Sequence, residues 1–343
     1  MSFPELTSPA GLTNLLYKTG ALHRGAVTNV SLDKEVDTIV STLTFLTATY
    51  SPDASPNLPE RLLLKRPLAT VNDAKKISQG EWDFYSRLAP QLPSPPIVPF
   101  YLATPDGSLL MQDLRTSHHN QPWPLLPSDT ECVRMVETLA LVHACWWENP
   151  ELGVTVGSPH TTESLSEMVS GVAALLPAFC DAAGDELSAF NRELFERVFG
   201  SRLRPWLRLT NPHAQTVIHG DAHSWNFLFP LQEQGPLYLI DWQLWHVDVG
   251  ARELAFLMAA HWDGERRRAK ELPLLQNYHE KLLASGIADY PWEEFWLDYR
   301  FGVARNLTIP LLFWNRGVQP RVWQHCLKCV LAAYEDLRCD ELL

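Results

Sequence analysis

Residues 217–229 read VIHGDAHSWNFLF and residues 239–243 read LIDWQ, and the architecture of the chain can be inferred outward from these two stretches. In the first, an apolar strand pattern runs into a glycine turn, followed by Asp221 and, five residues later, by Asn226. In the second, Asp241 ends another apolar strand pattern. Two carboxylates and an amide that converge supply the hard oxygen ligands that Mg²⁺ uses between phosphates. A free aspartate can also accept a proton from a hydroxyl nucleophile.

The two motifs, HGDxHxxN and IDWQ, resemble those of the aminoglycoside phosphotransferase and choline kinase superfamily, and most closely its ecdysteroid kinase-like branch. The resemblance implies an α+β, two-lobed protein-kinase-like fold, with a small β-rich N-lobe and a larger, mainly helical C-lobe. It further implies an ATP- and Mg²⁺-dependent phosphotransferase acting on a hydroxyl group of a small molecule. In that case Asp221 would be the catalytic base, Asn226 and Asp241 would hold the metal, and His219 would support the loop.

The resemblance also assigns residues for nucleotide binding. Lys65 ends an apolar strand pattern and is similar to the lysine that contacts the α- and β-phosphates, with Glu81 as its ion-pair partner. Residues 109–114, LLMQDL, look like the hinge between the lobes. The remaining implied contacts to adenine are the Gln112 carbonyl, the Leu114 amide, and the side chains of Leu228 and Ile240.

Composition excludes several classes of protein. The 343 residues carry a formal net charge of -12, which argues against binding to a nucleic-acid backbone. A hydrophobic fraction of 46% with 13 Trp and 14 Phe is typical of a folded chain rather than a disordered one. The N-terminus lacks a signal-peptide pattern, no stretch approaches the ~20 apolar residues of a membrane span, and six cysteines are too few for a disulfide scaffold. We therefore expect a cytoplasmic protein without a membrane span.

Local patterns predict a β-rich first lobe over residues 1–114. β-Branched and alternating residues predict three antiparallel strands, and helical spacing predicts a helix that ends before Pro90. A Pro-Asp-Gly turn predicts a hairpin. The predicted strands cover 26–31, 38–50 and 61–65, the helix 72–88, and the hairpin 100–103 with 108–112.

Residues 115–343 are predicted to form a mainly helical second lobe. Its first residues, 115–127, have the polar, proline-containing pattern of a linker. Ser128 and Glu131 form a capping-box pattern at the start of a helix over 129–147. Between the helices, one β stretch at 216–241 holds the two motifs. Further helices are predicted over 163–176, 186–199, 252–261, 272–284 and 322–337, and the strands of the β stretch over 216–218, 227–229 and 237–240.

Two features depart from the family pattern. The family places glycines in the loop between its first two strands, where backbone N–H groups approach the phosphates. Residues 31–41 contain no glycine and carry Asp33, Glu35 and Asp37, which would repel a triphosphate unless they point away from it or meet a cationic substrate. Whether this loop closes over phosphates is left open. Glu253 stands where the family commonly has aspartate before leucine, and it can serve the same structural role.

Two other functions compete with the kinase. His219, Asp221 and His223, with Asp241, could form a transition-metal hydrolase site, since histidine and carboxylate ligands suit zinc or iron. The glycine-free acidic loop is compatible with a pseudokinase-like module that binds nucleotide without transfer. The partner expected for the kinase is a hydroxylated small molecule. Its identity, the choice between ATP and GTP, and the oligomeric state stay open.

Overall fold

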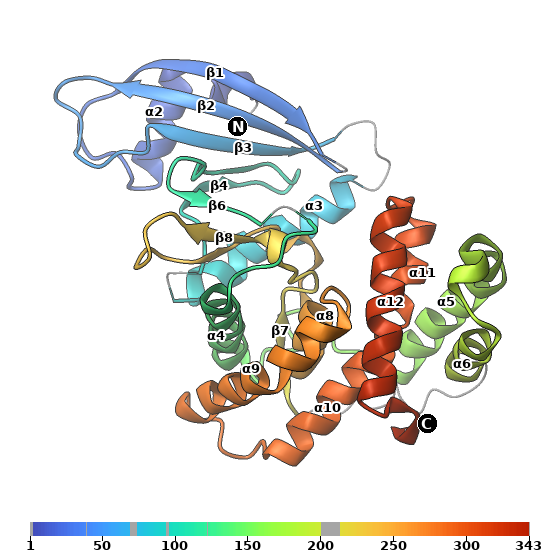
Figure 1. The fold of residues 1–343 in the computed structure, drawn as a ribbon. Helices are drawn as coiled ribbons and strands as arrows, with labels where there is room; N and C mark the ends of the chain where they lie inside the picture. Colours follow the sequence, from blue (N-terminus) through green and yellow to red (C-terminus); the bar gives the residue numbers. More distant parts are fainter. Residues whose placement is uncertain are drawn as a thin grey trace. The chain divides into compact units, whose positions relative to one another are not determined.

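The computed structural model describes residues 3–38, 40–68, 74–93, 96–121, 123–199 and 213–342 (Figure 1). Contacts divide the chain into two compact units. Unit 1 combines Met1–Asn120 with Asn226–Trp245, and unit 2 combines Gln121–Trp225 with His246–Leu343. The division predicted at residue 114 placed the whole of 115–343 in one lobe. The structure instead groups Asn226–Trp245, which carries the second motif, with the N-terminal residues.

Unit 1 is built on a five-stranded antiparallel sheet with the order β1-β2-β3-β5-β4. The three antiparallel strands and the hairpin predicted from the sequence are confirmed. In the centre of the sheet, Lys65 pairs with Leu43 on one side and Leu109 on the other. The strands are β1 (Val27–Asp37), β2 (Ser41–Tyr50), β3 (Arg61–Pro67), β4 (Phe100–Ala103) and β5 (Leu109–Gln112).

Two helices that the sequence did not predict, α1 (Phe3–Leu6) and α2 (Pro9–Lys18), precede this sheet. Ser8 caps α2, because its Oγ accepts a hydrogen bond from the Gly11 amide at 3.1 Å. The helix packs on β1, and its leucines join strand residues in one apolar core. That core includes Leu12, Leu15, Leu16, Leu46, Leu62 and Leu64, all of them buried.

The acidic part of the glycine-free segment, residues 31–37, is a strand rather than a loop, since β1 continues to Asp37. Its carboxylates accept hydrogen bonds from threonine hydroxyls of β2 across the strand pair. Each bond is 2.7 Å long, and Glu35 also forms an ion pair with Arg66 at 3.0 Å. Cross-strand pairing of this kind stabilises an exposed sheet face. The three acids therefore serve the β1–β2 pair.

The predicted helix at 72–88 consists of three successive segments. Residues 72 and 73 lie outside the described part of the chain. The α-helix α3 covers Ala74–Asp83, a π-helical turn η1 covers Phe84–Leu88, and a 3₁₀ turn η2 covers Ala89–Gln91. The helical path does not stop before Pro90, because the proline occupies the first turn of η2, where its missing N–H is tolerated.

Part of the predicted linker at 115–127 is the short strand β6 (His118–His119). It pairs with β8 (Phe227–Pro230), which pairs in turn with β9 (Tyr238–Leu239). The 3₁₀ turns η5 (Ser224–Asn226) and η6 (Trp242–Leu244) flank this small sheet in the sequence. These pairings join the second motif to unit 1.

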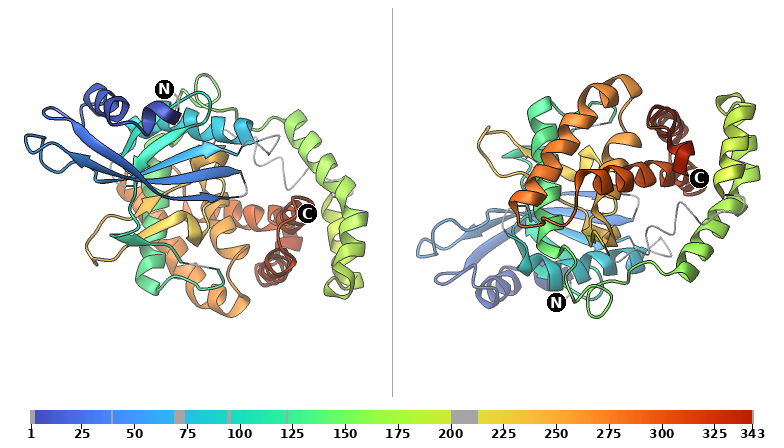
Figure 2. Two further views of the ribbon diagram at one scale, coloured as in Figure 1. Left: turned by 90° about the horizontal axis from the view of Figure 1, so that it is seen from above. Right: turned by 90° about the horizontal axis from the view of Figure 1, so that it is seen from below.

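Unit 2 is mainly helical, as predicted, and also contains a two-stranded antiparallel sheet of β7 (Gln215–Ile218) and β10 (His246–Val249). The Ser128–Glu131 capping box is confirmed, with hydrogen bonds of 2.7 and 3.3 Å. Figure 2 shows α4 beside α9, and α5 beside α6. The helices are α4 (Asp129–Trp146), α5 (Thr162–Ala183), α6 (Ala189–Phe199), α8 (Gly250–Ala259), α9 (Gly264–Ala284), α10 (Trp292–Arg305), α11 (Thr308–Asn315) and α12 (Pro320–Asp336), with 3₁₀ turns η3 (Gly184–Glu186) and η7 (Cys339–Leu342).

Several helix limits in unit 2 differ from those predicted. Helix α9 begins at Gly264 rather than at residue 272, because the Asp263 side chain accepts a hydrogen bond from the Arg266 amide at 3.0 Å and caps the helix there. Helix α5 continues past residue 176, through Pro177, to a glycine C-cap. Helices α10 and α11 were not predicted.

Residues 162–186, which contain α5 and η3, are long and apolar enough to cross a membrane by length and composition. The expectation that no stretch approaches this length is therefore wrong for α5. Length and composition do not distinguish a membrane span from a helix packed in a helical protein. Helix α5 packs against α6 and α11.

Candidate active site

A lysine and two carboxylates meet in unit 1. The Lys65 Nζ, on β3, lies 2.7 Å from Glu81 Oε2 on α3 and 2.5 Å from Asp241 Oδ1 just before η6. Glu81 is buried and the Lys65 side chain is 11% exposed, whereas Asp241 is 31% exposed. The ion pair between Lys65 and Glu81 that the resemblance implied is thus present, and the structure adds Asp241 to it.

Burial and ion pairing act in opposite directions on the charges of this cluster. Burial opposes the positive charge of Lys65, but the carboxylates of Glu81 and Asp241 outweigh it and raise the lysine pKa above its ordinary value. Burial raises the pKa of Glu81, and the Lys65 ammonium lowers it in part. With both acids ionised, one cation faces two carboxylates, and the remaining negative charge favours a cation nearby.

Asp241 is held in an unusual backbone conformation by the packing around it. Its φ of 68° and ψ of 51° are left-handed, which for a residue other than glycine costs about 1–3 kcal/mol. The next residue, Trp242, stacks on Phe84 with ring centroids 3.8 Å apart and planes 6° apart. Its indole N–H also donates to the Leu239 carbonyl at 2.9 Å. The stacking and the hydrogen bond hold Trp242 in place, and this fixes the direction of the Asp241 carboxylate before it.

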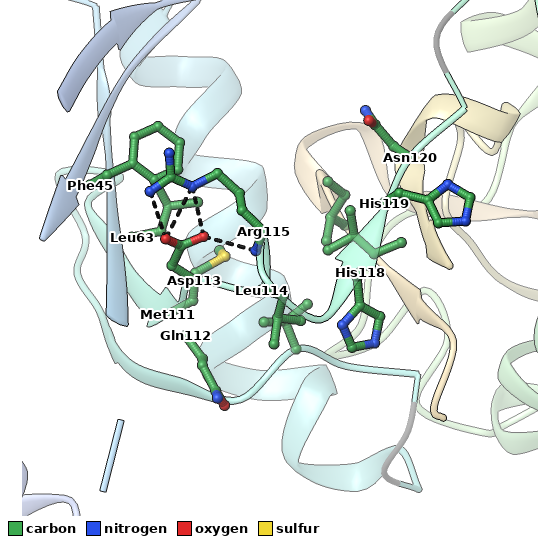
Figure 3. A pocket seen from close by; sticks show the side chains of 13 residues that line it. Phe45, Leu63, Met111, Gln112, Asp113, Leu114, Arg115, His118, His119 and Asn120 are labelled. Carbon is green, nitrogen blue, oxygen red and sulfur yellow. Dashed lines mark hydrogen bonds and ion pairs between the residues drawn. The ribbon is translucent and has the colours of Figure 1, made fainter. Parts of the chain in front are cut away.

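Two adjoining cavities lie in unit 1. The first, of about 310 Å³, is mostly apolar and is shown in Figure 3. The second, of about 170 Å³, is lined by Lys65, Glu81, Asn226 and Asp241. Both cavities share Leu63, Met111 and Ile240 in their linings.

The first cavity has the size and apolar lining that suit a flat heteroaromatic ring. Gln112, Leu114, Leu228 and Ile240, the four residues that the resemblance assigned to adenine, all line it. The chain turns sharply after β5, where the Leu114 carbonyl accepts a hydrogen bond from the His118 amide at 2.9 Å. The contacts of these four residues with a nucleotide stay predictions.

Sequence reasoning missed one wall of this cavity. The Arg115 guanidinium lies over the Phe45 ring, 3.6 Å from its centroid, and is held by Asp113 through hydrogen bonds of 2.8–3.1 Å (Figure 3). Position 115 read as the first residue of a polar linker, and Phe45 read as one apolar residue of a strand. Only the folding of β2 beside the β5 turn brings them together.

Asn226 and Asp241 line the second cavity together, and Asn226 is buried. Between them, the Ile240 amide donates to the Asn226 carbonyl at 2.9 Å, which ties the two motifs to each other. An amide oxygen and a carboxylate beside a negatively charged cluster are the donors that Mg²⁺ prefers. The residues present therefore fit the predicted metal, and their role as ligands stays a prediction.

Asp221 belongs to unit 2, where the chain turns after β7. The amides of His219 and Gly220 donate to the buried Glu253 carboxylate at 2.9 and 2.7 Å, and His143 Nε2 lies 2.9 Å from the same carboxylate. The Asp221 amide donates to His219 Nδ1 at 3.2 Å. Glu253 on α8 therefore anchors the loop through its longer side chain, and His219 supports the loop.

Within unit 2, the described residues do not bring His219, Asp221 and His223 together as a group of metal ligands. Among the described residues, the group whose ligand atoms all lie within 4.8 Å of one another is His160, His246 and Asp248. That group is unsuited to a metal cation, because Asp248 is already paired with Arg305 at 2.6 Å and lies 3.5 Å from Arg252. The two guanidinium groups would repel a metal cation there.

Comparison with known proteins gives a family and a fold. The model of the phosphotransferase enzyme family, APH, matches residues 55–296. No curated protein sequence matches the chain significantly. Among solved structures, the chain is similar to a choline kinase from Cryptosporidium parvum Iowa II, with 11% identity over 92% of this chain and 91% of that chain and a TM-score of 0.60.

Two further solved structures are similar over nearly their whole length. Macrolide 2'-phosphotransferase MphH from Brachybacterium faecium has 14% identity over 93% of this chain and 97% of that chain, with a TM-score of 0.54. ADP-bound aminoglycoside phosphotransferase APH(2'')-Ib has 13% identity over 89% and 93%, with a TM-score of 0.51. Identities this low establish the fold alone, which is the two-lobed α+β fold of these kinases.

Proposed function

The chain belongs to the phosphotransferase enzyme family, and we propose that it is a kinase that uses ATP and Mg²⁺ to phosphorylate a hydroxyl group of a small molecule. The observation that carries the proposal is the Lys65–Glu81–Asp241 cluster in a cavity that adjoins an apolar, ring-sized cavity. A lysine held by a buried acid is suited to phosphate oxygens, and a neighbouring apolar cavity is suited to a nucleobase. The ADP in the similar aminoglycoside phosphotransferase supports the nucleotide assignment.

In the proposed reaction, Lys65 binds the α- and β-phosphates while the first cavity holds adenine. Asp221 accepts the proton of the acceptor hydroxyl as the hydroxyl oxygen forms a bond to the γ-phosphorus. The bond from that phosphorus to the bridging oxygen of ADP breaks, and ADP leaves with the bond electrons. Asn226 and Asp241 would hold Mg²⁺, which when bound neutralises charge on the phosphates.

The acidic β1 segment was the reason to consider a pseudokinase, and the structure weakens that reason. Its carboxylates accept hydrogen bonds from the threonines of β2, and the second cavity is lined instead by Thr38 and Val40 from the β1–β2 turn and by Ser41 at the start of β2. Hydroxyl and backbone groups at that turn do not repel a triphosphate as carboxylates would.

Within the family, we assign the chain to the ecdysteroid kinase-like branch, on the HGDxHxxN and IDWQ motifs. We also propose a cytoplasmic location. All six cysteines are free thiols, which suits a reducing compartment, and ATP is abundant there.

The test is ADP formation from Mg-ATP in the presence of a panel of hydroxylated acceptors, together with calorimetric titration of Mg-ATP binding. Asp221→Asn should bind Mg-ATP like the unmodified protein and lose transfer by about a hundredfold or more, because a general base contributes ~10²–10⁴ in rate. The exposed Asp289→Asn is the matched control and should behave normally. Normal turnover by Asp221→Asn would overturn the proposed mechanism. If the unmodified protein binds Mg-ATP but transfers phosphate to none of the acceptors, the result would favour the pseudokinase.

A further inference from the structure

Rings from four separate parts of unit 2 gather beside Asp221. The His223 ring lies 4.6 Å from the Trp225 ring and 5.6 Å from the His261 ring, between centroids. His223 Nε2 lies 3.5 Å from Asp221 Oδ2, so this group of rings reaches the proposed catalytic base. We call five partly exposed residues the ring cluster: Trp123, His223, Trp225, His261 and His325.

Two buried nitrogen atoms of the ring cluster have no hydrogen-bond partner among the described residues, namely His223 Nδ1 and His261 Nε2. His325 differs, because its Nε2 donates to the His261 carbonyl at 3.0 Å. Buried polar atoms in folded proteins are nearly always paired, and each exception calls for an explanation. Two such atoms on rings 5.6 Å apart, beside a reactive carboxylate, point to a polar ligand.

The charges in and around the ring cluster suit an uncharged ligand better than a cationic one. Burial, with smaller contributions from His223 and His325 and an opposing one from Asp221, lowers the pKa of His261 to about 3, so His261 is neutral near pH 7. The Arg321 guanidinium already lies over the Trp123 ring, 5.1 Å from its centroid. A second cation on that ring would meet a like charge. The nearby Asp263 is engaged as the N-cap of α9.

This arrangement should discriminate between acceptors that carry an amine and acceptors that carry a second oxygen group. An amine or ammonium group would meet Arg321 at one end of the ring cluster, and only Asp221 would attract it at the other. A hydroxyl group, by contrast, both donates and accepts, so it can pair with His261 Nε2 in either tautomer of the neutral imidazole, whereas a carbonyl oxygen pairs with it only when Nε2 carries the proton. Phe256 packs edge-on against His261 with centroids 4.8 Å apart and keeps the ring in place.

We propose that His261 is a specificity-determining residue of the acceptor site, and that it binds a second oxygen group of an uncharged acceptor whose reacting hydroxyl lies at Asp221. The inference rests on the proposed function. It adds to that function the charge class of the acceptor and the need for two oxygen groups. The aromatic members of the ring cluster would contact the apolar body of the molecule.

The test uses pairs of acceptors with one skeleton, an uncharged diol and the amino alcohol in which an amine replaces the second hydroxyl. ADP formation from Mg-ATP is measured with each member. We expect kcat/KM for a diol to exceed that of its amino alcohol by about tenfold or more, because the ammonium group would bring a second cation to the ring cluster beside Arg321 and cannot accept a hydrogen bond from His261. Equal or better use of the amino alcohols, or no stimulation by any diol, would overturn the inference.

Two variants test whether His261 causes the preference for the diol. His261→Phe should raise the KM for the diol about tenfold and abolish the preference within the pair, while the KM for ATP stays the same. His261→Gln retains hydrogen-bonding groups and should recover most of the affinity. An unchanged diol KM in His261→Phe would refute the assignment. Failure of Mg-ATP to bind the unmodified protein would refute the proposed function itself, whereas transfer to amino alcohols alone would refute only this inference.

Discussion

Replacement of Glu253 by glutamine should destabilise the protein far more than its small change in shape suggests. The carboxylate is 1% exposed and receives the amides of His219 and Gly220 and the imidazole of His143, at 2.7–2.9 Å. Glutamine keeps one acceptor oxygen and turns its NH₂ group toward buried donors. Each buried group left unpaired costs about 1–3 kcal/mol. Loss of the charge from this network should therefore lower the free energy of unfolding by roughly 3–5 kcal/mol.

The destabilisation caused by Glu253→Gln should become smaller as the pH falls. Burial by itself would raise the pKa of Glu253, but the hydrogen bond from His143 and the nearby imidazoles hold it below the ordinary value of 4.5. A carboxylate with a depressed pKa stabilises the folded state above its unfolded pKa, and this contribution is lost as the pH falls through the folded pKa. The difference between Glu253→Gln and the unmodified protein should be largest near neutral pH and shrink below pH 4.5.

The assay is urea unfolding followed by far-ultraviolet circular dichroism at a series of pH values. Glu280→Gln is the matched control, because Glu280 is exposed near the C-terminal end of α9, and the free energy of unfolding of this variant should differ from that of the unmodified protein by less than about 0.5 kcal/mol. A loss of less than about 1 kcal/mol for Glu253→Gln at neutral pH would refute the reasoning. So would a difference that grows on acidification.

Three further variants test other parts of the structure. Gly250→Ala would place a Cβ 2.8 Å from the Tyr278 hydroxyl and should cost about 1–3 kcal/mol by urea unfolding; a neutral effect would contradict the close approach. Phe84→Ala removes the ring stacked on Trp242 and should cost about 3–5 kcal/mol by thermal unfolding; an unchanged melting temperature would contradict the stacking. Lys65→Met should weaken Mg-ATP binding about tenfold or more by calorimetry, and unchanged affinity would exclude a phosphate contact.

The strands of the first sheet and the helix α4 could be predicted because their signals are short-range. Alternation over a few residues indicates β1–β3, and Ser128 with Glu131 indicates the start of α4. The two motifs place chemically distinctive residues at fixed spacing, and from them the resemblance led to Lys65 and Glu81. These signals depend on neighbours in the chain, so the sequence alone carries them.

Tertiary structure decided what depends on contacts between distant segments. The acidic segment at 31–37 became a strand because β2 offers threonines in register with its carboxylates. Phe45 and Arg115 form a cavity wall only after β2 and the β5 turn come together. The ring cluster likewise joins residues as distant as Trp123 and His325. No local pattern encodes such pairs, since each side chain alone is equally typical of an ordinary core or surface position, and only packing makes them a site.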